Sequence, residues 1–128
     1  MEEKKLVYGN WNDNSSDFEW EQLNQRTKRF AIPGTDCTIV LNVIDTSLPG
    51  TNQPRPTHSH VYEQFMIFVE GEGVAEVDGI SYPITDGSFI VVPPGAQHKF
   101  DTAKTSKKVI NFDVFTPARN EYIKRKQK

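Results

Sequence analysis

The sequence predicts an all-β fold, a sandwich or barrel of short strands, and three observations support this prediction. Apolar and β-branched residues occur in short runs, which is typical of strands. Glycine and proline, eight of each in 128 residues, separate these runs, as expected for closely spaced strands and turns. No long stretch has the period of an amphipathic helix. The length fits one domain with a single hydrophobic core.

The predicted elements follow one another closely along the chain. The first thirty residues are aromatic but irregular, so we expect an arm or edge strands that lie over the barrel or over a partner subunit. Asp78-Gly79 predicts a hairpin turn, because a type I′ turn needs a positive φ that glycine adopts easily. A short surface helix or tail is expected at 118–128. Strands are predicted at residues 38–45, 64–69, 74–77, 80–82, 88–92 and 109–115.

Composition gives no reason to propose nucleic acid or membrane as a partner. The net charge is −2, and the one local excess of basic residues, at 124–128, is interpreted as a solvated end. No run approaches the length of a membrane span, and the first residues lack the apolar stretch of a signal peptide, so we expect a cytoplasmic protein. The single cysteine, Cys37, excludes an internal disulfide, and we interpret it as a buried apolar residue in a strand.

All three histidines lie in two short segments. His58 and His60 are two residues apart and therefore point to the same face of an extended strand. His98 follows the turn Pro93-Pro94-Gly95, where a neighbouring strand could begin. Neutral imidazole is the commonest protein ligand for zinc, iron, nickel and manganese. The sequence therefore predicts a mononuclear metal site on a sheet, with open positions for water or substrate.

A fourth ligand is expected from Glu63 or Gln64, and strand parity favours Gln64. Residue 64 shares a face with both histidines of the first segment, whereas Glu63 points the other way unless a bulge intervenes. Gln64 is neutral, so it leaves the cation its full charge and makes it a stronger Lewis acid. This favours proton-transfer chemistry at Zn²⁺, Ni²⁺ or Mn²⁺ over oxygen activation at iron.

A second polar group follows in the strand predicted at 109–115. Asp113 shares a face with Asn111 and Phe115, and an aspartate among apolar neighbours is costly to bury without a partner. A metal-bound water, a substrate hydroxyl or Arg119 could be that partner, and a solvated aspartate on an exposed face is the alternative. Basic residues at 26–29 precede the first strong strand, and we interpret them as a solvated run rather than as an inward arginine.

Two spaced motifs carry a resemblance to a known family. The first reads His58-x-His60, three residues, Gln64, six residues and Gly71, and the second reads Gly87, five residues, Pro93-x-Gly95, two residues, His98, three residues and Thr102. Both are similar to the motifs of the cupins, which implies a double-stranded β-helix, or jelly-roll, barrel. The chain departs at Asn52 and Thr102, where the family has Gly and Asn, and at Gln64, where it has Glu.

The stretch from Asp113 to Arg119, with Phe115, Thr116 and Pro117, is similar to one cupin group, the pectin-degradation proteins that linearise unsaturated uronates. That resemblance implies a metal set of three histidines and one glutamine. It also implies that Asp113 transfers a proton, that Phe115 shapes the pocket and that Arg119 orients a substrate carboxylate. Tyr62, Met66 and Phe68 share the parity of the ligands and are expected to line the cavity, with a core role equally open for Met66 and Phe68.

The sequence therefore predicts a barrel at residues 31–117, with metal motifs at 58–71 and 87–102, an arm at 1–30 and a tail at 118–128. The expected ligands of one divalent ion (Zn, Ni, Mn or Fe) are His58, His60, Gln64 and His98. The predicted function is isomerisation or ring-opening of a small oxygenated metabolite such as an unsaturated uronate. An iron-dependent dioxygenase and a non-catalytic module that binds a sugar acid are the alternatives. We expect a homodimer, as is common among cupins.

Overall fold

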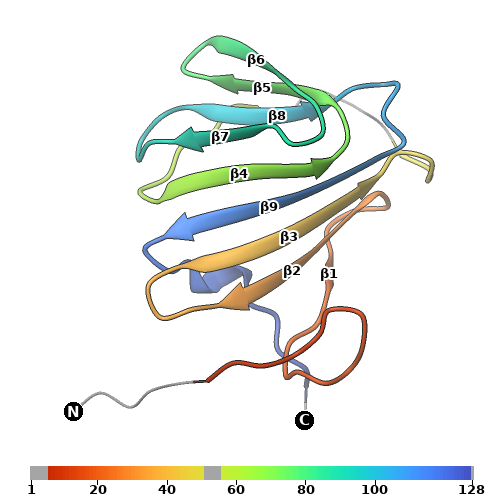
Figure 1. Ribbon diagram of the computed structural model, residues 1–128, viewed down its shortest axis with the longest axis vertical. Helices are drawn as coiled ribbons and strands as arrows, with labels where there is room; N and C mark the ends of the chain where they lie inside the picture. Colours follow the sequence, from red (N-terminus) through yellow and green to blue (C-terminus); the bar gives the residue numbers. More distant parts are fainter. Residues whose placement is uncertain (1–5, 51–55, 128) are drawn as a thin grey trace.

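The chain folds into two antiparallel β-sheets, as Figure 1 shows. The computed structural model describes residues 6–50 and 56–127; the motif position Asn52 lies outside them. The larger sheet has the order β1-β2-β3-β9-β4-β7, and the smaller has the order β6-β5-β8. The all-β prediction is confirmed. The elements are β1 (Glu21–Gln22), β2 (Thr27–Pro33), β3 (Thr38–Asp45), β4 (Glu63–Glu70), β5 (Gly73–Val77), β6 (Ile80–Ile84), β7 (Phe89–Val92), β8 (His98–Thr102), β9 (Lys108–Thr116) and the 3₁₀ helix η1 (Asn120–Tyr122).

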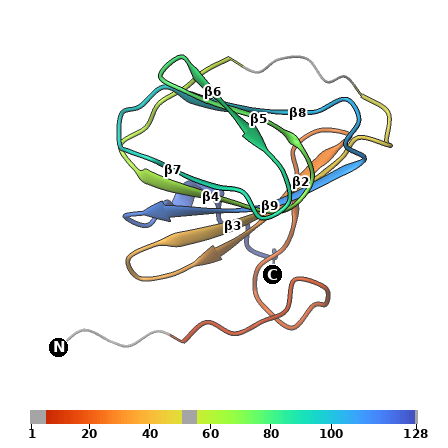
Figure 2. The ribbon, with the colours of Figure 1, turned by 45° about the horizontal axis from the view of Figure 1, so that its top comes forward.

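The smaller sheet faces the larger one, and apolar side chains fill the space between them (Figure 2). Met66 and Phe68 on β4 meet Ala75 on β5 and Phe100 on β8 in this core. The Phe68 and Phe100 rings lie 4.8 Å apart. The apolar residues of β4 thus follow the period-two pattern that places alternate side chains inside.

Most predicted strands are present with similar bounds, and the turn at Asp78-Gly79 has the expected backbone. Both residues have positive φ, 48° and 82°, and the turn joins β5 to β6. The interpretation of Cys37 is wrong, because this residue is only partly buried and lies in the turn between β2 and β3, where its carbonyl accepts from the Gly34 amide.

The N-terminal and C-terminal segments cover the outer face of β2, β3 and β9. Phe18 and Trp20 pack there against Phe30, and Ile123 packs against the same cluster. The two segments also pair with each other, since the Lys126 amide donates to the Asp17 carbonyl. Of the expected C-terminal helix, the described residues contain only the three-residue η1. The strand β2 spans the predicted boundary at residue 30.

Gly71 permits a close approach of two strands at the end of β4. Its φ is 110°, and a Cβ at this position would lie 2.7 Å from the Lys108 carbonyl oxygen and 2.7 Å from a Val109 methyl carbon. Its amide donates to Asp86 Oδ1 at 2.7 Å. A side chain at this position would therefore push β4 away from β9. Among the described residues no helix has the length and apolar character needed to cross a membrane.

Candidate metal centre and its pocket

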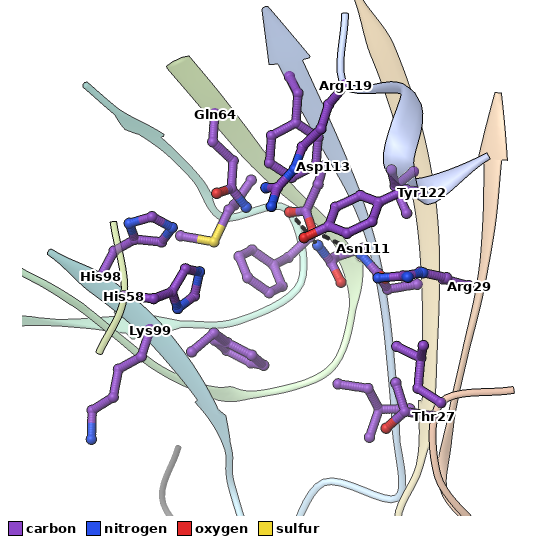
Figure 3. A pocket seen from close by; sticks show the side chains of 18 residues that line it. Thr27, Arg29, His58, Gln64, His98, Lys99, Asn111, Asp113, Arg119 and Tyr122 are labelled. Carbon is purple, nitrogen blue, oxygen red and sulfur yellow. Dashed lines mark hydrogen bonds between the residues drawn. The ribbon is translucent and has the colours of Figure 1, made fainter. Parts of the chain in front are cut away.

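A cavity of about 180 Å³ lies between the two sheets. Side chains from β2, β3, β9, β4 and β8 line it, and Figure 3 shows His58 and His98 at one end and Arg29 with Tyr122 at the other. The polar side chains between the two ends include Asp113 and Asn111. The cavity is smaller than the roughly 300–1,000 Å³ typical of sites for drug-sized ligands, so it suits a small metabolite.

The three histidines converge, although they do not share one regular strand. His58 precedes β4 and pairs with His98, the first residue of β8, through two backbone hydrogen bonds of 3.0 and 2.8 Å. The His58 and His98 rings have centroids 4.2 Å apart, and His60 lies 4.7 Å from His98. A short antiparallel bridge thus brings together imidazoles that are forty residues apart in sequence.

Two of the rings are oriented by backbone carbonyls. His60 Nδ1 lies 3.0 Å from the Tyr62 oxygen, and His98 Nδ1 lies 2.9 Å from the Ala96 oxygen. A carbonyl only accepts, so each Nδ1 carries the proton and the Nε2 of the neutral ring keeps a lone pair, which at His60 faces the Gln64 amide oxygen, itself an acceptor. His98 Nε2 is buried and has no hydrogen-bond partner among the described residues. In metal sites, a hydrogen bond from the other ring nitrogen to a carbonyl fixes the orientation of a histidine ligand in this way.

Gln64 lies beside the histidines, and Glu63 does not. The Gln64 side chain is 6% exposed, and its Oε1 lies 2.9 Å from His60 Nε2. Glu63 is the preceding residue of β4 and pairs with Thr116, so its side chain is on the opposite face. Parity along the strand therefore places the amide, and not the carboxylate, at the cavity.

The donor set fits a single divalent ion. The ligand atoms of His58, His60 and His98 all lie within 4.8 Å of one another. Two imidazole nitrogens bound to one Zn²⁺ at about 2.1 Å lie at most about 4.2 Å apart, so small side-chain movements suffice. The unpartnered His98 Nε2 gives an independent reason to expect a cation, since a buried polar atom normally has a partner.

Burial favours the neutral form of His58 and His98. Burial lowers the pKa of His58, and the nearby His98, His60 and Arg119 lower it further. Burial also lowers the pKa of His98, against a smaller opposing effect of its hydrogen bond to Ala96. Neutral imidazole is the form that binds a metal.

We predict that proton competition for the metal sets in only at acidic pH. An unperturbed histidine is half protonated near pH 6.5. Because the pKa values of His58 and His98 are lowered, metal affinity at pH 6.5 should stay close to its value at pH 8 and fall below that range. Competition with a chelator across a pH series measures this. A midpoint of affinity loss at or above pH 6.5 would contradict the prediction.

Asp113 lies in the same cavity and is held by three carboxamides. Asn42 Nδ2 donates to its Oδ2 at 2.8 Å, Asn111 Nδ2 donates to its Oδ1 at 3.0 Å, and the Gln64 side chain donates as well. Burial raises the pKa of Asp113 to about 6, although these three hydrogen bonds and the nearby His60 oppose the rise. The carboxyl can therefore gain or lose a proton near neutral pH.

The register of the larger sheet brings these three carboxamides next to Asp113. Gln64 pairs with Phe115 and Asn42 pairs with Asn111, so both amides are diagonal neighbours of Asp113 on one face. Asn111 is two residues from Asp113 on the same strand and shares that face. The partner of Asp113 is therefore a set of amides, and Arg119, one of the partners considered from the sequence, bonds instead to Glu121.

Arg119 and aromatic rings form one wall of the cavity. The Arg119 guanidinium carbon lies 4.9 Å from the Phe115 ring centroid, 5.1 Å from that of Tyr62 and 4.2 Å from that of Tyr122. Arg119 Nε donates to Glu121 Oε1 at 2.7 Å, and the Arg119 amide donates to Thr38 Oγ1. These contacts hold the guanidinium at the cavity.

The expected lining residues divide into two groups. Met66 and Phe68 line the cavity and also belong to the core between the sheets, so both interpretations of them apply. Phe115 lines the cavity as well. Tyr62 was expected to line the cavity, but it is not among the lining residues. It lies in a bend before β4, with its ring centroid 5.9 Å from that of His60 and 6.2 Å from that of Phe115.

Arg29, Asn42 and Tyr122 are among the cavity residues that were not predicted as site residues. Arg29 was placed in a solvated run, but it lines the cavity, with its Nε 2.8 Å from Glu21 Oε1 and its guanidinium carbon 4.0 Å from the Tyr122 ring centroid. The inward arginine, the alternative considered from the sequence, is thus the correct interpretation for this residue. Asn42 and Tyr122 had no sequence signal, because each comes from a segment outside both motifs.

Fold and donor set together define a jelly-roll β-barrel protein with a cluster of three histidines that could hold a metal ion. The chain belongs to the cupin domain family, whose model matches residues 46–115, more than half of the 128 residues. No match was found among curated protein sequences.

Solved structures of cupins have the same fold. An RmlC-like cupin from Shewanella frigidimarina is 24% identical, with a TM-score of 0.67 over 86% of this chain and 93% of its own. KdgF from Halomonas sp. is 18% identical, with a TM-score of 0.72 over 92% and 98%. Streptomyces Pac13, described as a nucleoside dehydratase, is 15% identical, with a TM-score of 0.62 over 96% and 92%.

Proposed function

We propose that this chain is a metal-dependent cupin enzyme that isomerises or opens the ring of a small acidic metabolite, with an unsaturated uronate as the specific substrate. The observation that carries the proposal is the position of Asp113. This residue lies in one cavity with Gln64, His58 and His98, which form a cluster with His60, and burial raises the pKa of Asp113 to about 6. The pairing of a proton-transfer group with a Lewis-acid site suits chemistry at a carbon next to an oxygen.

The metal would be held by His58, His60 and His98, with Gln64 Oε1 as the fourth ligand. A bound divalent cation would supply Lewis acidity toward a substrate hydroxyl or carbonyl oxygen. Asp113 would take a proton from the substrate and return it at another atom. Because its three hydrogen-bond donors are neutral amides and not a bonded cation, Asp113 keeps the basicity that this task needs.

The charge of the cavity supports an acidic substrate. Arg119 and Arg29 both line it, one on either side of Tyr122 (Figure 3). The Nε edge of Arg119 is bonded to Glu121, so a substrate carboxylate would bind to its Nη groups. The stretch from Asp113 to Arg119 resembles that of cupins that linearise unsaturated uronates, and the similarity to KdgF is in line with that resemblance.

The experiment that tests the proposal is a direct assay. Protein loaded with Zn²⁺, Ni²⁺ or Mn²⁺ is expected to accelerate the loss of the conjugated ene absorbance of unsaturated galacturonate or mannuronate monomer. No acceleration, with bound metal confirmed by elemental analysis, would exclude this substrate class. Oxygen uptake in the presence of Fe²⁺ would support the dioxygenase instead. Thermal stabilisation by the sugar acid without turnover would support a binding module.

We also propose that the protein is a homodimer. The outer faces of β4 and β7 carry an apolar surface that the N-terminal segment does not cover, with Ile67, Val69, Phe89 and Val91 exposed by 41, 54, 75 and 42%. Ile67 and Phe89 are directly paired across the two strands. Contiguous exposed apolar side chains of this kind are typical of a protein interface.

A further inference from the structure

Gln64 is the side chain that connects the histidines to Asp113. Its Oε1 lies 2.9 Å from His60 Nε2. Because Gln64 pairs with Phe115, it is a diagonal neighbour of Asp113 on the same face of the sheet, and its side-chain hydrogen bond lowers the pKa of that carboxyl. In Figure 3 the amide oxygen is on the side of His98 and the amide nitrogen is on the side of Asp113. The two ends of one buried amide therefore serve two different groups.

This arrangement requires an amide. An ionised carboxylate accepts hydrogen bonds and donates none, so a glutamate at position 64 could bind a cation but could not hold Asp113. It would also place two carboxylates side by side in a buried site, which is strongly unfavourable unless one is protonated. Asn42 and Asn111 are the other two donors to Asp113.

We propose that Gln64 is a positioning residue for Asp113 in addition to a ligand, and that the site accepts one carboxylate, at position 113 or at position 64, but not at both. A cation bound through Oε1 would fix the amide plane and with it the N–H that holds Asp113. Metal binding and the identity of residue 113 are then energetically coupled through Gln64. The inference rests on the proposed metal site but not on the proposed substrate.

A simpler interpretation gives a different result. If Asn42 and Asn111 alone hold Asp113, Gln64 acts only as a ligand, and residue 113 does not influence what position 64 contributes to metal affinity. Substitutions that do not interact have additive effects within about twofold in an equilibrium constant. A double-mutant cycle therefore separates the two interpretations.

The test compares the full-length wild-type protein with Gln64→Glu, Asp113→Asn and the double variant, in Zn²⁺ affinity measured by chelator competition at pH 8. We expect Gln64→Glu to raise the affinity at least tenfold more in the Asp113→Asn background than in the wild-type background. In the double variant the carboxylate and the amide have exchanged positions, so the donor and the acceptor are both restored. If Gln64→Glu changes the Zn²⁺ affinity by the same factor in both backgrounds, within about twofold, the proposal is overturned.

A second measurement does not depend on metal or turnover. In urea unfolding with excess chelator, Gln64→Glu is expected to lower the midpoint in the wild-type background, and Asp113→Asn is expected to restore much of the loss. An equal fall of the urea midpoint in both backgrounds counts against the coupling.

The matched control is Gln97→Glu, which makes the same change at an exposed residue next to His98. Its effect on the urea midpoint should not depend on residue 113. If the uronate assay fails while the cycle shows coupling, the substrate is wrong and the inference stands.

Discussion

Replacement of His98 by alanine is expected to lower the affinity for a divalent cation by at least about 100-fold. Loss of a residue that hydrogen-bonds to a metal ligand typically lowers metal affinity about 10- to 100-fold, so loss of the ligand itself should lower it more. His98 is 2% exposed, its Nδ1 donates to the Ala96 carbonyl, and its Nε2 has no partner in the part of the chain that the structure describes. Elemental analysis of the purified variant and chelator competition measure the effect.

The control for His98→Ala is Gln97→Ala, an exposed neighbour at the start of β8 that should keep its metal. Because His98 is buried, urea unfolding in excess chelator shows whether the variant still folds. A folded His98→Ala protein that retains wild-type metal stoichiometry and affinity would show that the three histidines are not a joint ligand set.

The strands with a clear apolar pattern could be predicted from the sequence, and β2 could not. The predicted strand at 38–45 coincides with β3, whose neighbours cover both of its faces. In β2 the adjacent charges Lys28 and Arg29 interrupt the apolar pattern, because one points outward and one inward. Lys28 lies 4.3 Å from the Trp20 ring centroid on the outer face, and Arg29 is held inside by Glu21. That ion pair with the edge strand β1 is a tertiary contact without a local signal.

The spacing of the histidines and the parity of Gln64 were sufficient to predict which side chains gather at the cavity. Both properties are local: the two-residue strand period, and a turn after which β8 begins. The set of carboxamides that hydrogen-bond to Asp113 was not predictable in the same way. Asn42 reaches Asp113 because β3 pairs with β9 in a register that places Asn42 opposite Asn111, and that register depends on the whole sheet. Tyr122 enters the site from a segment that folds back after β9.

Asp113→Asn is expected to lower kcat by about 100- to 10,000-fold on the substrate that the assay identifies, the range typical of a lost general acid or base. The variant keeps the size of the side chain and removes its ability to accept a proton. Gln64 and the three histidines remain, so bound metal should persist, with a modest change in affinity. The measurement is kcat together with metal content in the same preparation.

The fold of the Asp113→Asn variant should tolerate the loss of the charge. The pKa of Asp113 is raised to about 6 in the folded protein from 3.8, so folding favours the protonated form. The raised pKa of Asp113 therefore adds to the free energy of unfolding at low pH, and this contribution is lost as the pH rises from 3.8 through about 6. At pH 8, above both values, the ionised carboxyl therefore costs on the order of 3 kcal/mol relative to a neutral one. Removal of that charge offsets the loss of one acceptor for Asn42 or Asn111.

The control for the kinetic effect is Asp36→Asn, the same chemical change in the exposed turn between β2 and β3, which should leave kcat unchanged. If Asp113→Asn retains at least a tenth of wild-type kcat with full metal content, Asp113 is not the proton-transfer group. The role would then pass to another titratable side chain of the cavity. If kcat and metal content fall together, the loss of activity reports the ligand set and not the carboxyl. Only a fall in kcat at constant metal content shows that Asp113 is the group that transfers the proton.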